Sequence, residues 1–510
     1  MERLGWQFIG VLILFLGLGK IFLEPLMSQN QYGAAWIVGY SNDSTFYPKY
    51  GKTEINFSSG NIDIQYKYGE NLPSSGFTNA SLASADGTLR YFTDGFRIYN
   101  GSQKIIENGD SINYGRIWED YTSVYPTGFN HYFVPMPGKE NTHAVLLNFS
   151  VNYYPDFINR YTFIPHLKYS LLKFDSLRQK DIVLIKDSII TDGDFVESHM
   201  ALTKHANGRD WWIIIEDYLS NNHKIYLLDT SGVRLYSSQM IGDRADSFDW
   251  TGNSLFTPNG EMFIKYLRGY QIQIFDFDRC LGMLSNPRMV INETALLKDA
   301  CFFSISPNNR FLYLNSDSVI WQYDLLASDI KSSESIVGEW DGYSFENRLT
   351  TAFFQSSLAM DGKIYFSCRS SSIYLHVINN PNEKGTKCDF QLRQVELPAF
   401  MFGNLPTPPN YNLSSKKLSP CDTLLLSNSG NYTVDDGISI FPNPVSSYFS
   451  ISPNFHSDFT FKVVDLLGNT LKMFRSNNFN IYDLSDIPPG IYLVHIRSKQ
   501  QETIRKILVE

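Results

Sequence analysis

The sequence predicts an all-β protein: a β-propeller of about seven blades followed by a small C-terminal immunoglobulin-like β-sandwich. Composition is the first observation, because 15% aromatic and only 19% charged residues, with 34 Gly and 22 Pro, favour strands joined by turns. The second is a turn-and-strand unit that recurs through the body, with its later copies roughly 50 residues apart, the size of one four-stranded blade. The third is the C-terminus, where short alternating apolar stretches end at Pro, Gly or Asn.

The N-terminus, residues 1–28, has the form of a signal peptide. One early basic residue, Arg3, precedes the uncharged stretch 4–19, which is shorter than the ~20 residues of a membrane span. Lys20 and Glu24 then interrupt the apolar run. We expect processing near the end of this segment, and no transmembrane segment once it is removed.

Residues 29–413 are predicted to form the propeller body, one closed ring with almost no helix. Its repeated unit opens on Asp-Gly, Asn-Gly or Asn-Asn and continues as alternating aromatic and β-branched residues. The clearest copies begin at Ala83, His205, Thr257, Ser306 and Ala359. A single unit cannot bury both of its faces, so successive units must stack around an axis. An array of β-sandwiches is the competing architecture, disfavoured because no linker separates the units.

Residues 414–436, rich in Ser, Lys, Asn and Asp, are predicted to be a linker to a C-terminal domain at residues 437–510. Three motifs mark the turns and strand ends of that domain in order: Pro442, Asn443 and Pro444, then Asp465, Gly468 and Asn469, then Gly490 and Tyr492. The prolines cannot donate to a ladder and should end a strand at an edge. Gly468 or Asn469 supplies the positive φ of a hairpin. The terminal strand, 503–509, should close the sheet.

This succession of motifs, closing at the C-terminus, resembles the type A C-terminal sorting domain of proteins exported by the type IX secretion system of Gram-negative bacteria. The resemblance implies that the domain engages the type IX secretion machinery and that the chain passes through the periplasm. It implies a secreted or outer-membrane surface protein that loses this domain on export. An ordinary immunoglobulin-like module is the alternative.

The body has a resemblance of its own, which covers residues 81–423. It is carried by segments such as YFTDGFRIYN, KHANGRDWWIII, SISPNNRFLYL, LAMDGKIYFS and LPTPPNYNL, with SPCDTL at the close. They are similar to segments of a family of secreted propeller-like proteins from bacteria with type IX secretion, which commonly end in the same sorting domain. This resemblance implies the propeller and export, and it implies no activity.

The segment KHANGRDWW is the most tempting constellation for chemistry. His205 and Asp210 are the weak catalytic candidates, an acid–base pair at a loop mouth, with the following tryptophans able to stack a sugar ring. The structural alternative is that Asn207-Gly208 makes a turn into a strand and that His205 and Asp210 tie this turn down by hydrogen bonds. We favour the structural alternative.

We predict no cofactor and no metal site. The acidic pairs Asp192/Asp194 and Asp276/Asp278 do not continue into a twelve-residue calcium loop, so we expect them to cap turns. The sequence has no nucleophile elbow, Gly-rich phosphate loop or HExxH motif.

The five cysteines all lie in the second half of the chain: Cys280, Cys301, Cys368, Cys388 and Cys421. An odd count leaves one unpaired, and spacing alone does not say which residues pair. Export places them in an oxidising compartment, where disulfides form.

Two classes of function remain. The favoured one is a secreted binding module for an extracellular glycan or protein ligand, and the alternative is an extracellular hydrolase or lyase that acts on polymers with its site on the propeller axis. A net charge of −9 disfavours nucleic acid as a partner. A deep axial pocket lined by converging acids, His or Arg would indicate the enzyme, whereas a shallow aromatic face would indicate binding.

Overall fold

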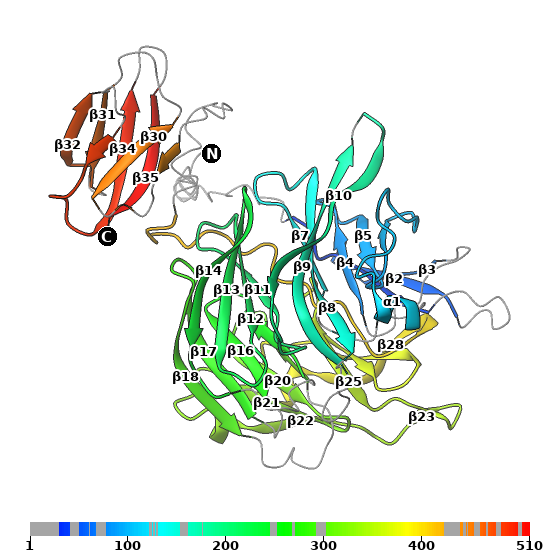
Figure 1. Ribbon diagram of the computed structural model, residues 1–510. Coiled ribbons are helices and arrows are strands. Elements are labelled where there is room, and N and C mark those ends of the chain that lie inside the picture. The colour runs from blue at the N-terminus through cyan, green and yellow to red at the C-terminus, as the bar shows by residue number, and fades with distance from the viewer. Residues whose placement is uncertain are drawn as a thin grey trace, which may run out of the picture. The chain divides into compact units, whose positions relative to one another are not determined.

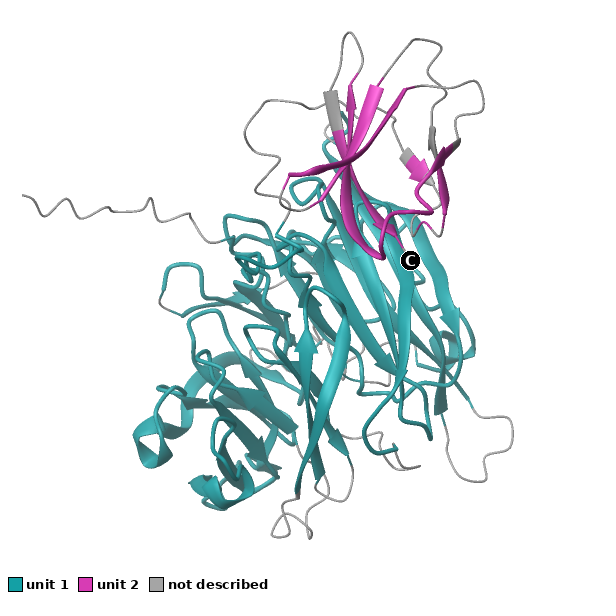
Figure 2. Cartoon of the chain, turned by 90° about the vertical axis from the view of Figure 1, so that its left-hand side faces the viewer, with its two compact units in different colours: residues 1–424 teal, residues 425–510 magenta. Residues whose placement is uncertain are grey.

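The computed structural model describes residues 30–422 and 439–509, apart from internal gaps. These gaps are 41–49, 61, 68–77, 122–124, 126–127, 129–130, 154–161, 176, 245–251, 268–270, 292–301, 442–444, 446, 453–459, 466–467, 476–480 and 498–501. The predicted signal peptide, residues 1–28, lies outside the described residues. The chain forms two compact units, residues 1–424 and 425–510, coloured separately in Figure 2.

Unit 1 contains seven sheets of three or four strands in the part of the chain that the structure describes (Figure 1). In each sheet, neighbouring strands are consecutive in sequence and antiparallel, so each is one blade of a propeller. The first three blades are β1 (Ala35–Gly39), β2 (Lys52–Asn56), β3 (Asp63–Lys67); β4 (Ala80–Ala83), β5 (Leu89–Thr93), β6 (Ile98–Asn100); and β7 (His131–Pro135), β8 (His143–Tyr153), β9 (Thr162–Asp175), β10 (Lys180–Asp192).

Each of the other four blades has four strands. They are β11 (Ala201–Lys204), β12 (Trp211–Glu216), β13 (Asn222–Asp229), β14 (Gly232–Met240); β15 (Ser254–Phe256), β16 (Met262–Leu267), β17 (Gln271–Asp278), β18 (Met283–Ile291); β19 (Phe302–Ile305), β20 (Phe311–Asn315), β21 (Val319–Asp324), β22 (Ser335–Glu339); and β25 (Phe353–Leu358), β26 (Ile364–Cys368), β27 (Ser372–Ile378), β28 (Phe390–Met401). The predicted all-β fold with about seven blades is confirmed.

Helix is confined to short turns among the described residues. The helical elements are α1 (Arg116–Asp120), η3 (Lys331–Ser333) and η4 (Gly385–Cys388), and a small hairpin is formed by β23 (Ser344–Phe345) and β24 (Leu349–Thr350). Within these residues, no helix has both the length and the apolar character needed to cross a membrane.

The β12 strand shows why an apolar run becomes the middle of a blade. All six of its residues are buried, because β11 and β13 pair with its two edges and neighbouring blades cover its two faces. Trp211, Ile213 and Ile215 pack in the cluster shared with the preceding blades, whereas Trp212 and Ile214 pack in the one shared with the following blade. The two-residue period of a strand thus sends alternate side chains to opposite neighbours.

The ring closes where the last blade meets the first. Trp36 of β1 and Phe57, just after β2, form an aromatic group with Tyr365 of β26, at centroid distances of 4.9 to 5.9 Å. Leu375 of β27 and Leu397 of β28 belong to the same buried cluster. Blades that lie more than 300 residues apart in sequence are therefore neighbours, which a closed propeller requires.

A strap follows the last blade, and we use this name for residues 402–422. Gln355 of β25 makes two hydrogen bonds with Leu405, at 2.7 and 2.9 Å, and Ser357 donates to the carbonyl of Pro406 at 2.7 Å. The strap then reaches other blades, since Tyr411 Oη donates to the carbonyl of Phe133 at 2.7 Å. Residues 414–422, expected to begin the linker, are thus part of a segment that lies along the body.

Unit 2 is a seven-stranded β-sandwich in its described residues. One sheet has β29 (Ser439–Phe441), β30 (Tyr448–Ser452) and β33 (Ile481–Asp483); the other has β32 (Thr470–Arg475), β31 (Thr460–Val464), β34 (Gly490–Arg497) and β35 (Glu502–Val509). Phe449, Val463, Tyr492 and Val494 lie in its core.

The predicted turn motifs of unit 2 have local roles where the structure describes them. Gly468 has a φ of 90°, and the Asp465 side chain accepts hydrogen bonds from the backbone and side-chain amides of Asn469, both at 2.8 Å. Gly490 is the first residue of β34, and Tyr492 Oη donates to the carbonyl of Pro488 at 2.8 Å. Pro442, Asn443 and Pro444 lie outside the described residues.

Candidate functional site

His205 and Asp210, the catalytic candidates, lie in the turn between β11 and β12. The backbone amide of His205 donates to the carbonyl of Asp210 at 2.8 Å, and the ring Nδ1 of His205 accepts from the amide of Asn207 at 3.0 Å. The Asp210 carboxylate accepts from Asn207 Nδ2 at 2.6 Å and from Arg209 Nε at 2.7 Å. These contacts stabilise the turn itself, and Asp210 is 5% exposed.

A cavity of about 370 Å³ lies in the middle of the ring. Its walls come from β11, β15, β19 and β25, the edge strands that face the axis, and from residues 407–412 of the strap. We call it the axial cavity. Its polar wall residues are Tyr132, Thr203, Ser254, Thr257, Ser304, Ser356, Ser357, Thr407, Asn410, Tyr411 and Asn412, and the rest are Gly33, Ala201, Leu202, Leu255, Phe256, Pro258, Ile305, Pro307, Leu358, Ala359, Met360, Gly362, Pro408 and Pro409. Each of these 25 described residues is uncharged.

The hydroxyl groups of this lining bridge neighbouring blades. Ser304 of β19 donates to Ser356 of β25 at 2.9 Å, and Ser254 donates to the carbonyl of Ser198 at 3.3 Å. Tyr132 Oη donates to the carbonyl of Met200 at 3.0 Å, and burial raises the pKa of this phenol to about 12. The lining therefore combines fixed hydroxyl dipoles with apolar and aromatic surface and stays neutral over the ordinary pH range.

A second hollow, a depression of about 710 Å³, spans the first three blades. Its lining is charged: Glu54 and Lys67 form an ion pair at 3.0 Å, and Arg90 donates to the carbonyl of Asn141 at 3.1 Å. Asp181, also in the lining, accepts from Tyr91 Oη at 2.5 Å. Most of these charges already have partners within the protein.

A buried ionic cluster joins the fourth and fifth blades, and the sequence reasoning missed it. Glu216 lies 2.6 Å from His199 Nδ1 and accepts from Lys265 Nζ at 2.5 Å, and all three side chains are at most 1% exposed. Burial alone would raise the pKa of Glu216, but Lys265 and the nearby histidines lower it to about 2. Burial lowers the pKa of the neighbouring His223 to about 4. The cluster acts as a polar contact between blades, and the packing of the fourth blade against the fifth brings Lys265 of β16 to Glu216 of β12.

The acidic pairs considered for calcium have other partners. Asp192 lies 2.7 Å from His166 Nδ1, Asp276 accepts from Arg288 at 2.6 Å, and Asp278 accepts from the backbone amide of Cys280 at 2.7 Å. Among the described residues, no group of three or more His, Cys, Asp or Glu side chains is arranged to hold a metal ion.

The described cysteines divide into one disulfide and two thiols. Cys280 and Cys421 are bonded across a sequence separation of 141 residues, with Cα atoms 5.6 Å apart. Cys368 and Cys388 are buried and free. Cys301 lies outside the described residues.

Comparison with known proteins identifies the C-terminal unit. Residues 439–510 match the family described as "Secretion system C-terminal sorting domain". This segment is a type IX sorting domain, so the protein is exported to the cell surface or secreted by that system. No curated protein matches the chain.

Solved structures similar to the chain share little sequence with it. A protein from Lactobacillus plantarum is 9% identical over 73% of this chain and 99% of its own, with a TM-score of 0.44. The periplasmic gluconolactonase PpgL from Pseudomonas aeruginosa is 11% identical over 74% of this chain and 99% of its own, with a TM-score of 0.39. Citrobacter koseri AztD is 12% identical over 74% of this chain and 87% of its own, with a TM-score of 0.35.

Proposed function

We propose that the propeller is a binding module for an extracellular ligand, and that the axial cavity is its site. The observation that carries this proposal is the lining of that cavity, in which hydroxyl, aromatic and aliphatic groups from five blades converge without a charge among the described residues. Cavities of this size and mixed character, with a few placed polar groups, are typical ligand sites.

The lining favours an uncharged ligand that carries hydroxyl groups, such as one or two units of a saccharide. A charged ligand would lose its hydration in this cavity and meet no counter-charge, which is costly. A saccharide loses less, because hydroxyl groups can exchange hydrogen bonds with Ser and Thr while its apolar face contacts Phe256 or Tyr411.

The lining supports binding over the hydrolase or lyase alternative. General acid–base chemistry uses a His, Asp, Glu, Lys, Cys or Tyr within hydrogen-bond reach of the substrate. Of these, the described walls of the cavity supply only Tyr132 and Tyr411. Both phenols donate to backbone carbonyls, and burial raises the pKa of both. His205 and Asp210 are not among its walls, and their hydrogen bonds hold a turn.

A glycan and peptide array with the purified exported chain tests the proposal. We expect uncharged glycans among the bound spots, and we expect Met360→Trp, which narrows the cavity, to abolish their binding. Leu235→Trp is the matched control, because Leu235 is 55% exposed on the outer strand β14. Selective binding of charged glycans or peptides, or unchanged binding by the Met360 variant, would contradict this site.

A further inference from the structure

The strap forms one wall of the axial cavity and is held at both ends. At its start, β25 binds it through the hydrogen bonds of Gln355 and Ser357. Within the wall, Asn410 Nδ2 donates to the carbonyl of Pro258 at 2.7 Å, and the strap tyrosine Tyr411 is anchored on β7. The strap therefore spans the ring from the seventh blade to the third and fifth.

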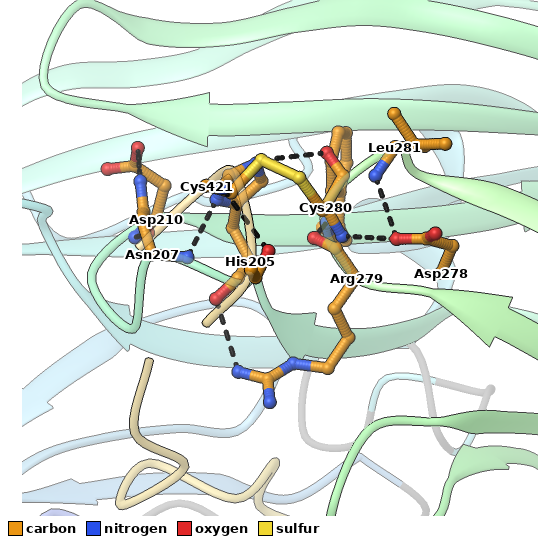
Figure 3. The surroundings of a disulfide bond; sticks show 10 residues. His205, Asn207, Asp210, Asp278, Arg279, Cys280, Leu281 and Cys421 are labelled. Atoms are coloured by element: carbon orange, nitrogen blue, oxygen red, sulfur yellow. Dashed lines mark hydrogen bonds between the residues drawn. A yellow bond between two sulfur atoms is a disulfide. The ribbon is translucent and has the colours of Figure 1, made fainter. Parts of the chain in front are cut away.

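The far end of the strap lies on the turn that contains His205. The backbone amide of Lys416 donates to the carbonyl of Ala206 at 2.8 Å. Arg279, only 4% exposed, donates through one terminal nitrogen to the carbonyls of His205, at 3.2 Å, and Ser414, at 2.8 Å. Figure 3 shows the Arg279 guanidinium at the carbonyl of His205, and the disulfide formed by the next residue, Cys280.

The turn requires a glycine at position 208 because of its backbone conformation and because the strap lies close to it. Its φ is +75°, and a Cβ atom there would lie 2.5 Å from the backbone nitrogen of Ser415. The strap backbone thus sits directly against the turn, closer than any side chain permits. The segment KHANGRD, residues 204–210, therefore forms the surface of the body against which the end of the strap packs.

We propose that the Cys280–Cys421 disulfide is the latch that fixes this strap, so that the axial site is complete only in the oxidised, exported protein. The proposal rests on the proposed function for the meaning of the site, but the latch itself can be tested without a ligand. From Phe402 to Cys421 the strap has no regular strand. Leu405 and Tyr411 are buried in core clusters, whereas the part that follows Tyr411 is held by hydrogen bonds, the ion pair of Lys416 with Glu261 and one covalent bond. Such a segment opens locally at much lower free energy than the blades, unless a covalent bond holds its end.

Formation of the latch requires an oxidant. The two thiols lose two protons and two electrons as the sulfur–sulfur bond forms, and a disulfide of the oxidising partner is reduced to two thiols. We expect that partner to be a thiol–disulfide oxidant of the compartment that receives the chain after the inner membrane. Before this step, the wall made by residues 407–412 would open and close.

Hydrogen exchange of the full chain tests the latch. In the double variant Cys280→Ser, Cys421→Ser we expect the amides of residues 402–422 to exchange roughly tenfold faster or more, because local opening is no longer opposed. Peptides from β20 and β26 should exchange as in the wild type. Unchanged exchange in the strap, or an equal increase in the blades, would overturn the proposal.

If the double variant does not fold, exchange is compared before and after the folded wild-type chain is treated with a thiol reductant. Faster exchange in the strap alone supports the latch, and unchanged exchange overturns it. A separate pair of variants tests the docking of the strap on the turn. Gly208→Ala should also speed exchange in the strap with the disulfide intact, because the added Cβ displaces Ser415. Gly60→Ala is the matched control, since Gly60 has a similar φ of +78° and nothing within 4 Å of a Cβ. Equal behaviour of these two variants would count against docking of the strap on the turn. If the strap loosens but glycan binding persists, the proposed site is wrong and the latch stands.

Discussion

The Asp210 carboxylate accepts three hydrogen bonds at 2.6, 2.7 and 3.1 Å, from Asn207 and Arg209 of its own turn. At the scale of the residue, the groups that suggest chemistry in this chain hold its backbone in place. Buried His199, Glu216 and Lys265 do so between two blades. These three residues stabilise the contact only as a complete group, because a buried charge without its partner lowers the free energy of unfolding.

We expect Asp210→Ala to lower stability without any effect specific to a substrate. The loss of these bonds within a nearly buried turn should cost about 1–3 kcal/mol in the free energy of unfolding. Urea unfolding of the full chain measures it, with Asp210→Asn as the conservative variant. An unchanged free energy of unfolding, together with loss of ligand binding, would return Asp210 to the candidate site.

Three buried histidines make stability depend on pH. Burial lowers the pKa of the imidazole from its ordinary value of 6.5 to about 3 in His131 and to about 4 in His223 and His376. His376 is held neutral, because its Nε2 donates to the carbonyl of Thr351 at 2.8 Å while its Nδ1 accepts from the amide of Arg393 at 3.1 Å.

We therefore expect the protein to lose stability as pH falls from 6.5 toward 4. In this window the unfolded chain binds protons that the folded histidines do not, so unfolding becomes more favourable, by about 2 kcal/mol per histidine at pH 5. Urea unfolding at pH 5 to 7.5 measures how the free energy of unfolding changes with pH. His376→Asn should lower the number of protons taken up on unfolding by about one, and the slope falls in proportion. A free energy of unfolding that stays constant over this range would contradict the expectation.

At the scale of the element, alternation along a strand assigns side chains to neighbours. In β35, Ile507 is fully buried in the sandwich core, whereas Ile504 is 50% exposed. The strand pairs along its whole length with β34, from Gly490 to Arg497. It is the last strand of its sheet, and on the side away from β34 the Val445 amide donates to the carbonyl of Leu508 at 2.7 Å.

Two substitutions in β35 compare its core-facing side with its exposed side. Ile507→Ala should destabilise unit 2 by about 2–5 kcal/mol, because it leaves a cavity in a small core. Ile504→Ala on the opposite face should change stability by less than about 0.5 kcal/mol. Limited proteolysis of the full chain, with the release of unit 2 fragments followed over urea concentration, distinguishes them. Equal effects would mean that the inward and outward faces of β35 are assigned wrongly.

At the scale of the whole molecule, the chain divides into two compact units, each with a hydrophobic core of its own. Unit 2 has its own core, with eleven buried residues among those that the structure describes, and unit 1 closes on itself through its first and last blades. The sorting domain carries export, and the proposed binding site lies entirely in unit 1. Removal of one should leave the other folded.

Deletion after Asp436 tests this division in a host with type IX secretion. We expect a folded body that stays in the periplasm, while the intact chain reaches the surface or the medium, there without its C-terminal domain. Cell fractionation with an antibody against the body gives the location, and the melting temperature gives the folding. Normal export of the truncated chain would contradict the prediction, and so would a body that fails to fold.

Local chemistry allowed much of this protein to be read from its sequence. Turn residues followed by alternating apolar residues predicted the blades and the sandwich, because strand period and turn conformation depend on neighbours within a few positions. The motif order after residue 437 pointed to the sorting domain through its resemblance to known sorting domains, and the family match confirms it. The turn at Asn207-Gly208 was also predicted from its residues, although the strap that lies on Gly208 was not.

Only the tertiary structure decided how distant parts of the chain combine. It paired Cys280 with Cys421, laid the segment LPTPPNYNL along the axial cavity, and brought Lys265 to Glu216 across two blades. None of these contacts has a local signature, since each side chain and backbone group involved is equally compatible with other partners in the unfolded chain. Ring closure selects among those partners, because packing the first blade against the last fixes which residues face the axis and which strands become neighbours.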